Sequence, residues 1–214
     1  MNCMKATLNQ MRKPLVVSII IKINIVVFFL WFIFGYEPSF MIRHFLVSWE
    51  AVSEGRIWTL ITSVFSHNML FHIFINMFVF YGFGMTLEKV FGPYRFLRFY
   101  LAAGITGSIG HCLVSTIILD MPNVPALGAS GAISGVILLF SLMFPKEKLL
   151  ILGLIPIPAI WGAIMFVALD LWGLIAQSRG STLPIGYGAH LGGALCGMTY
   201  YIFFVRKKVV IRQI

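Results

Sequence analysis

Six long apolar runs, separated by short polar segments, dominate the pattern of residues along the chain. They cover residues 15–36, 70–87, 96–119, 130–144, 158–176 and 189–205. A helix needs about 20 mostly apolar residues to cross the hydrocarbon core of a bilayer, and most of these runs are close to that length. The pattern therefore predicts an all-α membrane protein, a bundle of six transmembrane helices with a short fourth helix at its centre.

The fourth run is the exception in length. Its roughly 15 residues make a helix of roughly 22 Å at 1.5 Å per residue, too short for a hydrocarbon core of about 30 Å. Backbone groups without hydrogen-bond partners cannot face lipid, so the start of this helix should lie inside the protein or face a watery cavity. We expect a functional site at that point.

Two further segments are too interrupted to cross lipid. Residues 37–56 contain Pro38, Trp49 and several charges, which favours a long loop at the membrane interface. Residues 149–156 are apolar but contain Gly153 and Pro156, which predicts an interfacial loop. The predicted organisation is a short N-terminal segment (1–14), one integral membrane domain (15–205) and a basic tail (206–214).

Composition excludes a soluble globular protein. Hydrophobic residues make up 59% of the 214 residues and charged residues 11%, against about 45–50% and about 25% in ordinary soluble domains. Three widely separated cysteines, Cys3, Cys112 and Cys196, do not form a CxxC pair. This spacing argues against a disulfide framework and a cysteine-based zinc site, and we expect neither a metal nor another cofactor.

The basic residues are distributed unevenly about the predicted helices. Of the 16 lysines and arginines, twelve fall on the side of the N-terminus, Lys22 lies within the first run, and Arg43, Arg56 and Arg179 fall on the opposite side. This positive-inside bias predicts that both termini are cytosolic, and we expect the cytoplasmic membrane of a prokaryote. It also explains the net charge of +9 without a nucleic-acid partner.

Polar residues inside membrane helices are costly and are candidates for function. The second run contains His72 and Asn76, four residues apart and therefore on one face of a helix. The fourth run opens at Ser130, and the sixth opens with His190 near its start. In the predicted topology these three openings all lie towards the same side of the membrane, where they can meet.

The chemistry of these residues is complementary. A serine hydroxyl becomes a good nucleophile when a neighbouring histidine accepts its proton, so Ser130 and His190 are candidates for nucleophile and base. A developing oxyanion requires hydrogen-bond donors, which the Ser130 backbone N–H, the His72 ring and the Asn76 amide can supply. This set of residues predicts acyl transfer.

The carboxylates do not fit this site as readily. Asp120 belongs to a loop and Asp170 to the middle of the fifth run, so we expect neither to orient His190, and we predict a Ser–His dyad. Asp170 is then either a paired packing residue or a residue of gating or solvent access. Small residues spaced by four in the fourth and sixth runs allow these two helices to pack closely. The same pattern would also be seen if the glycines served only helix packing and the serine and histidine beside them had no shared function.

Three sequence blocks resemble the rhomboid intramembrane serine proteases. They are Gly128-Ala129-Ser130-Gly131, Ala189-His190-Leu191-Gly192-Gly193, and the series His67, His72, Asn76, Gly84, Glu88 and Gly92. The resemblance implies a six-helix core with Ser130 as nucleophile, His190 as base, and an oxyanion hole formed by His72, Asn76 and the Ser130 amide. It also implies that residues 37–56 form a membrane-lying loop and that Glu88 is a structural hydrogen-bonding residue.

Two positions depart from the family pattern. Family members often have Trp-Arg in the first loop, whereas Trp58 is followed here by Thr59. Some members have an aromatic residue one turn after the nucleophile, stacked on the histidine, and this position is Ser134. Ser134 could form a hydrogen bond instead, and the sequence leaves open how the His190 ring is held.

These observations predict an intramembrane serine endopeptidase that cleaves transmembrane segments of single-span proteins. Its expected partners are transmembrane protein substrates and the lipid bilayer, with no nucleic acid and no cofactor. One alternative is a catalytically silent rhomboid-like protein that binds transmembrane clients. A second alternative is a small transporter that uses His72, Asn76, Asp170 and His190 as a polar path.

Overall fold

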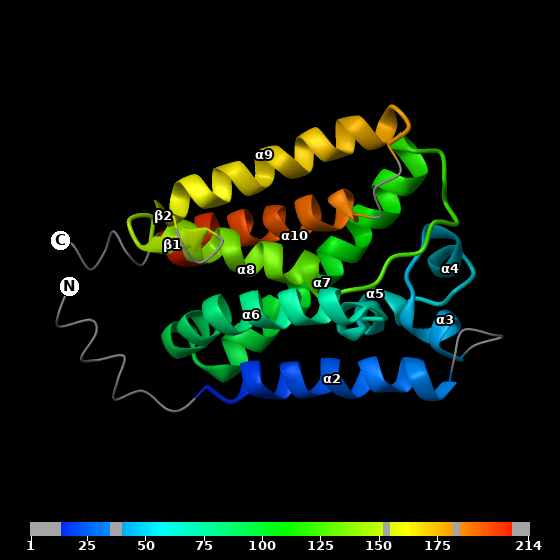
Figure 1. The fold of residues 1–214 in the computed structure, drawn as a ribbon, viewed down its shortest axis with the longest axis horizontal. Helices are drawn as coiled ribbons and strands as arrows, with labels where there is room; N and C mark the ends of the chain where they lie inside the picture. Colours follow the sequence, from blue (N-terminus) through cyan, green and yellow to red (C-terminus); the bar gives the residue numbers. More distant parts are fainter. Residues whose placement is uncertain (1–13, 35–39, 152–154, 182–184, 207–214) are drawn as a thin grey trace.

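The computed structural model describes residues 14–34, 40–151, 155–181 and 185–206. Long helices lie side by side, with α2 at one edge of the bundle and α9 at the other (Figure 1). The long elements are α2 (Val16–Phe34), α6 (Leu70–Phe91), α7 (Pro93–Leu113), α8 (Ser130–Met143), α9 (Ala159–Ser178) and α10 (Tyr187–Tyr200). Two π-helical turns, η2 (Val114–Ile118) and η3 (Tyr201–Val205), extend α7 and α10.

Within the part of the chain that the structure describes, five helical segments are long and apolar enough to cross a membrane, namely Val16–Phe34, Leu70–Phe91, Pro93–Ile118, Ala159–Ser178 and Tyr187–Val205. Their outer faces carry large exposed apolar side chains such as Phe32, which is 69% exposed, and Trp172, which is 74% exposed. Lipid is the solvent that such surfaces require. The prediction of an all-α membrane protein is confirmed, whereas six membrane-crossing helices stay a prediction because α8 has only 14 residues.

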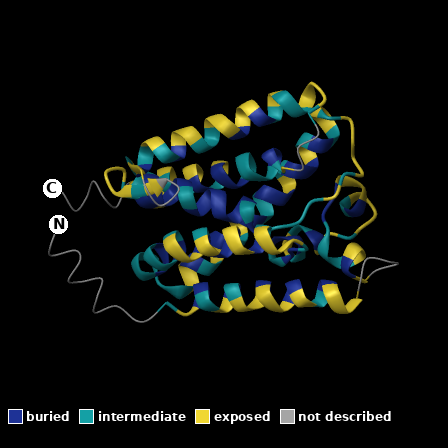
Figure 2. Ribbon diagram, in the orientation of Figure 1, coloured by how far each residue is buried: buried dark blue, intermediate teal, exposed yellow. Residues whose placement is uncertain are grey.

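The short helix α8 occupies the centre of the bundle. Ten of its 14 residues are buried, whereas α9 buries four of 20 (Figure 2). It packs against α6, α7, α9 and α10. The start of α8 therefore lies among other helices, as its length predicted.

Glycines allow α8 and α10 to approach each other closely. A Cβ atom on Gly193 of α10 would lie 1.8 Å from the carbonyl oxygen of Gly131 of α8. One on Gly197 would lie 2.5 Å from the carbonyl oxygen of Gly135. Atoms of real side chains do not approach backbone this closely, so glycine is required at both crossings. This contact brings the first turn of α8 against the first turns of α10.

The segment after α8 differs from its prediction. Where a loop was expected over 149–156, β1 (Lys148–Ile151) pairs antiparallel with β2 (Ile155–Pro158), with Lys148 opposite Pro158. Pairing satisfies backbone polar groups of an apolar segment at the end of the bundle, which an open loop would leave exposed. Gly153 lies outside the described residues.

The first polar segment and the residues that follow it, up to the start of α6, form several short helices. They are α3 (Phe40–Phe45), α4 (Trp49–Ser53), α5 (Thr59–Thr62) and the 3₁₀ turn η1 (Ser63–Phe65). None is long enough to cross lipid, in agreement with the prediction, although much of the expected loop is helical. Pro38 lies outside the described residues, as do the predicted terminal segments except Pro14 and Arg206.

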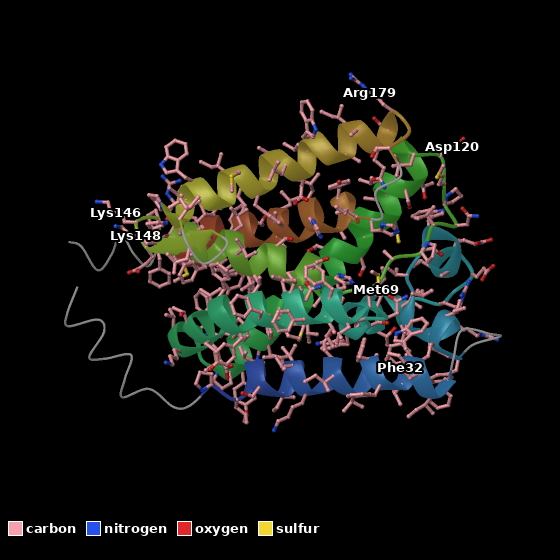
Figure 3. All side chains as sticks on the ribbon, in the orientation of Figure 1. Phe32, Met69, Asp120, Lys146, Lys148 and Arg179 are labelled. Atoms are coloured by element: carbon pink, nitrogen blue, oxygen red, sulfur yellow. The ribbon has the colours of Figure 1, made fainter. Side chains whose placement is uncertain are left out.

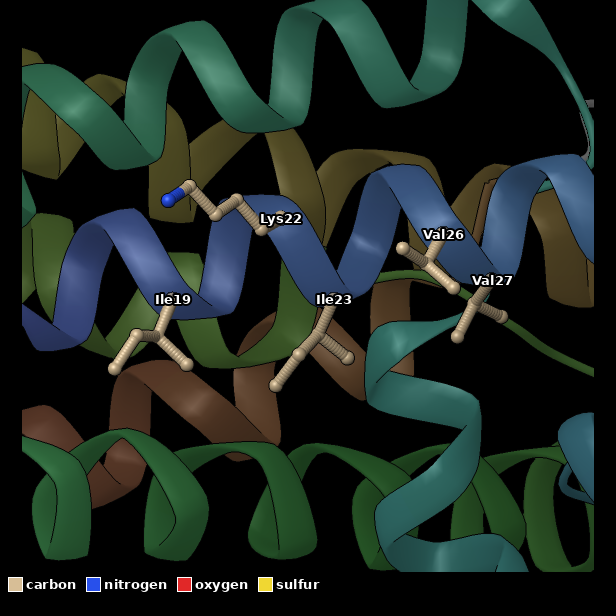
Figure 4. Close-up of a pocket in the computed structure, with 5 residues that line it drawn as sticks. All are labelled: Ile19, Lys22, Ile23, Val26 and Val27. Carbon is tan, nitrogen blue, oxygen red and sulfur yellow. The ribbon is translucent and has the colours of Figure 1, made fainter.

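Glu88 and Lys22 occupy the end of the bundle where α2 begins. The buried Glu88 carboxylate of α6 accepts hydrogen bonds from three backbone N–H groups at the start of α2, those of Leu15 just before the helix (2.7 Å), Val16 (2.9 Å) and Val17 (2.8 Å). The structural role expected for Glu88 is therefore confirmed: it caps α2. Lys22 extends back along α2 beside a lipid-facing groove, as a snorkelling lysine does (Figure 4).

Charged residues mark the two ends of the bundle. Lys146 and Lys148 lie at the end where α2 begins, and Asp120 and Arg179 lie at the opposite end (Figure 3). The first turns of α6, α8 and α10 point towards this second end (Figure 1). The openings that carry the predicted site residues therefore lie in the same half of the molecule.

Candidate active site

The chain enters α8 through a sharp turn. Gly128 has a φ of +126°, a backbone conformation that residues other than glycine rarely adopt. Its N–H donates to the Ser63 carbonyl (2.9 Å), and the next N–H, that of Ala129, donates to Nε2 of His67 (3.3 Å). These contacts fix the backbone just before Ser130, whose own N–H lies at the helix start, where α8 offers it no acceptor.

Ser130 and His190 are hydrogen-bonded. The Ser130 Oγ lies 2.9 Å from Nε2 of His190, although the two residues are 60 positions apart in the sequence. The His190 side chain is only 14% exposed, so little water competes for this contact. The predicted pair is thus brought together, with the geometry that proton transfer from a hydroxyl to an imidazole requires.

Asp170 completes a line of three residues, and here the sequence-based expectation was wrong. Its Oδ1 lies 2.9 Å from Nδ1 of His190, and its side chain is 7% exposed. Asp170 lies eight residues before the end of α9, whereas His190 lies three residues after the start of α10. The middle of α9 therefore meets the first turn of α10.

The carboxylate determines which nitrogen of His190 carries a proton. An Nδ1–H donating to Asp170 leaves Nε2 with a lone pair directed at the Ser130 hydroxyl. The hydroxyl then donates to Nε2. Such an arrangement can take the serine proton as the oxygen attacks an acyl carbon, and the carboxylate can stabilise the imidazolium that forms.

An aromatic ring covers His190, but it comes from an unexpected helix. Phe166 of α9 stacks on the imidazole with ring centroids 5.7 Å apart and an interplanar angle of 28°. Ser134, at the position where some family members have the aromatic residue, donates to the Ser130 carbonyl of its own helix (2.8 Å). Phe166 was not predicted from the sequence. Its position four residues before Asp170, which places both on one face of a helix, was the only indication that the two could act on the same group.

His72 lies beside the turn that precedes Ser130. A Cβ atom on Gly128 would lie 2.7 Å from Cε1 of His72, so the ring packs directly on the glycine. Asn76, one turn further along α6, is buried and donates to the backbone carbonyl of His72 (3.0 Å). The structure thus brings His72 to the turn that precedes Ser130. One of the two Asn76 amide hydrogens is already used in the hydrogen bond within α6.

His67 supports the same turn as a neutral ring. Burial, and then the neighbouring His72 ring at a centroid distance of 4.8 Å, lower the pKa of His67 from 6.5 to about 3. A neutral imidazole can accept the Ala129 N–H, whereas a protonated one has only donors. Among the described residues, no group of three or more histidines, cysteines or carboxylates is placed to hold a metal ion.

Comparisons with known proteins give the family. A model described as the Rhomboid domain matches residues 54–207. The chain is 33% identical over 183 residues to "RHOMBOID-like protein 12, mitochondrial" of Arabidopsis thaliana, and this alignment covers 80% of this chain and 53% of that protein. It is 32% identical over 197 residues to "Rhomboid protein 1, mitochondrial" of Saccharomyces cerevisiae, covering 89% and 53%. The human "Presenilin-associated rhomboid-like protein, mitochondrial" is 31% identical over 186 residues, covering 86% and 47%.

The names of these relatives contradict one prediction. The cytoplasmic membrane of a prokaryote, with cytosolic termini, was expected, whereas the relatives are named as mitochondrial and, in one case, as chloroplastic. A positive-inside bias orients helices in many membranes and therefore does not identify the compartment. The chain spans about half the length of the curated relatives it matches. Because the matched domain covers well over half of the chain, this protein belongs to the rhomboid family.

Proposed function

We propose that this protein is an intramembrane serine endopeptidase. The observation that carries the proposal is the hydrogen-bonded line from Ser130 through His190 to Asp170, at the buried start of a helix too short to cross a membrane. Rhomboid family membership supports the same reaction class. The sequence suggested a dyad, and the proposed centre adds Asp170 as the residue that orients the base.

The proposed reaction proceeds through an acyl-enzyme. The Ser130 oxygen attacks the substrate carbonyl while its proton passes to Nε2 of His190, and the Asp170 carboxylate stabilises the imidazolium. The imidazolium then gives this proton to the leaving amine as the peptide bond breaks. Water attacks the resulting ester, its proton passes to His190 and then to the Ser130 oxygen, and the new carboxyl terminus leaves.

Donors around the nucleophile turn are proposed to stabilise the oxyanion. The Ser130 N–H lies at the positive end of α8, and the His72 ring packs against Gly128, two residues earlier. The Asn76 amide has a second hydrogen besides the one that it donates to His72. These three donors are the oxyanion hole that the sequence suggested.

The proposed substrates are transmembrane segments of single-span proteins. The site lies among helices that are long and apolar enough to cross a membrane, so a substrate segment is expected to reach it from the bilayer. A peptide bond in an intact helix is hydrogen-bonded and shielded, so segments that unwind easily are favoured. An organellar membrane is the proposed location, because relatives at 31–33% identity are named as mitochondrial.

A serine-directed fluorophosphonate probe tests the chemistry on the purified, detergent-solubilised protein. The wild type should be labelled and should cleave a single-span reporter, whereas Ser130→Ala and His190→Ala should do neither. Asp170→Asn should lower both rates about 10- to 100-fold, because one hydrogen bond to a charged group is lost. Ser134→Ala is the matched control and should behave as the wild type.

Two results would overturn the proposal. Labelling that persists in Ser130→Ala would place the reactive serine elsewhere. A folded wild type that is neither labelled nor active on the reporter would favour the silent relative, and co-purification of an intact single-span client would then measure the binding function.

A further inference from the structure

The His190 ring is held by α9 at two points. Phe166 covers one face of the imidazole, and Asp170 binds its Nδ1. The two residues are four positions apart and therefore project from the same face of α9, one turn apart. His190 itself belongs to α10, and Ser130 belongs to α8. The orientation of the ring therefore depends on a third helix.

Helix α8 does not provide the ring contact that its position would allow. Ser134 lies one turn after Ser130, has a small side chain, and directs its hydroxyl to the carbonyl of Ser130 at 2.8 Å. An imidazole held only by hydrogen bonds at its two nitrogens can still swing about the line that joins them. A stacked ring on its face restricts that motion.

We propose that Phe166 is a positioning residue that keeps the His190 ring in the plane in which Nε2 faces the Ser130 hydroxyl. This inference rests on the proposed function and deepens it, because it assigns the support of the base to α9. Phe166 does not contact the reacting atoms of a substrate in this scheme. Its effect passes entirely through the ring of His190.

Close packing of α9 on α10 sets the distance between Phe166 on α9 and the His190 ring on α10. A Cβ atom on Gly173 would lie 2.2 Å from the Tyr187 ring, so this tyrosine packs directly on the backbone of α9. Gly173 follows Asp170 by three residues, and Tyr187 precedes His190 by three. The contact therefore lies one turn from the Asp170–His190 bond on both helices.

The rest of α9 offers few other anchors near the site. Its buried residues are Ala159, Ala163, Asp170 and Gly173, three of which are small. Ala163 packs in a cluster with Leu138 of α8 and Ala194 of α10. The Gly173–Tyr187 contact is thus a close approach of the α9 backbone to α10 beside the histidine.

Phe166→Leu and Phe166→Tyr test the ring directly. Leucine keeps apolar volume but cannot stack, so kcat on the reporter should fall about two- to tenfold, the range that one stacked aromatic pair supports, with KM little changed. Tyrosine keeps the ring and should stay within about twofold of the wild type. The labelling rate with the fluorophosphonate probe should follow kcat in both variants. Phe203→Leu, at a residue that is 62% exposed on η3, is the matched control.

Gly173→Ala tests the spacing by another route. The added methyl group must push Tyr187 or α9 aside, so kcat should fall at least as far as in Phe166→Leu. Gly162→Ala is the control on the same helix, because its Cβ atom would meet only ends of side chains, at 3.2 Å and beyond. Thermal unfolding of each variant separates loss of fold from loss of rate.

The outcomes separate this inference from the proposed function. If the wild type is not labelled, the proposed function fails first. If the wild type is labelled and folded Phe166→Leu keeps the wild-type kcat, or if Phe166→Tyr loses as much as Phe166→Leu, the positioning role is overturned while the endopeptidase stands.

Discussion

Gly193→Ala should separate the helices that carry Ser130 and His190. Gly193 lies three residues after His190 on α10, and its partner Gly131 directly follows Ser130 on α8. The new Cβ atom would lie 1.8 Å from the Gly131 carbonyl oxygen, where real Cβ contacts are essentially never below 3.0 Å. Because the obstacle is backbone, no side-chain rotation relieves it, and the two helices must move apart by about 1.2 Å, the difference between these distances.

The expected loss of activity follows from this displacement. An opening of about 1.2 Å would lengthen the Ser130–His190 hydrogen bond from 2.9 Å to about 4 Å, which is beyond hydrogen-bonding range. A misplacement of about 1 Å at a reacting centre costs about 100-fold in rate. We expect the labelling rate with the fluorophosphonate probe, and kcat on the reporter, to fall by about that factor.

The assay compares Gly193→Ala with Gly82→Ala. Gly82 is also a helical glycine, on α6, but a Cβ atom there would have no atom within 4 Å, so this variant should label at the wild-type rate. Both proteins are first checked for intact fold by thermal unfolding. A folded Gly193→Ala protein that labels at the wild-type rate would refute this prediction, because the glycine contact would then not set the distance between Ser130 and His190.

Three further predictions concern stability, measured as the free energy of unfolding in mixed detergent. Glu88→Ala removes the acceptor of three backbone N–H groups at the start of α2 and should cost about 3–5 kcal/mol. The pKa of His67 is about 3 in the folded protein and about 6.5 in the unfolded chain, so the unfolded chain takes up the proton first as the pH falls. The contribution of the neutral ring to stability is therefore complete above pH 6.5, falls as the pH drops towards 3, and is lower by about 2 kcal/mol at pH 5. His67→Gln should remove this part of the acid dependence. His111→Leu removes the ring nitrogen that contacts the Val124 carbonyl at 3.0 Å and should cost about 1–3 kcal/mol, with a smaller loss for His111→Gln.

Each stability prediction has its own contrary result. Glu147 is an exposed carboxylate at the same end of the bundle, and a loss in Glu147→Ala as large as that in Glu88→Ala would contradict the capping role. An unchanged slope of stability between pH 7 and 5 in His67→Gln would mean that another group causes the acid sensitivity. Equal losses of stability in the two His111 variants would mean that His111 does not stabilise the protein through its hydrogen bond to the Val124 carbonyl.

Helix positions were predictable because lipid imposes strict rules on the chain. A spanning segment must be apolar and must satisfy its backbone hydrogen bonds internally, so changes from polar to apolar residues mark its ends. The predicted second run over 70–87 is found as Leu70–Phe91, and the fourth over 130–144 as Ser130–Met143. The hairpin of β1 and β2 was missed because short apolar segments with proline have no distinctive period.

The pair of Ser130 and His190 was also predictable. Few polar residues lie within the apolar runs, so each of them stands out, and glycines near both residues indicated that their helices approach closely. The support of His190 was not predictable. Asp170 looks the same in the sequence whether it faces His190, another polar group or a lipid headgroup, and Phe166 is one of 20 phenylalanines in an apolar chain.

By itself, the sequence determined which segments are apolar enough to cross or enter the membrane, and it singled out Ser130 and His190 as a pair. The tertiary structure alone decided that Asp170 and Phe166 of α9 contact the His190 ring. The physical reason is that hydrophobic periodicity determines the span of a helix in the bilayer, whereas its rotation and depth relative to its neighbours depend on packing. Here the contact of Tyr187 with Gly173 brings the middle of α9 against the first turn of α10.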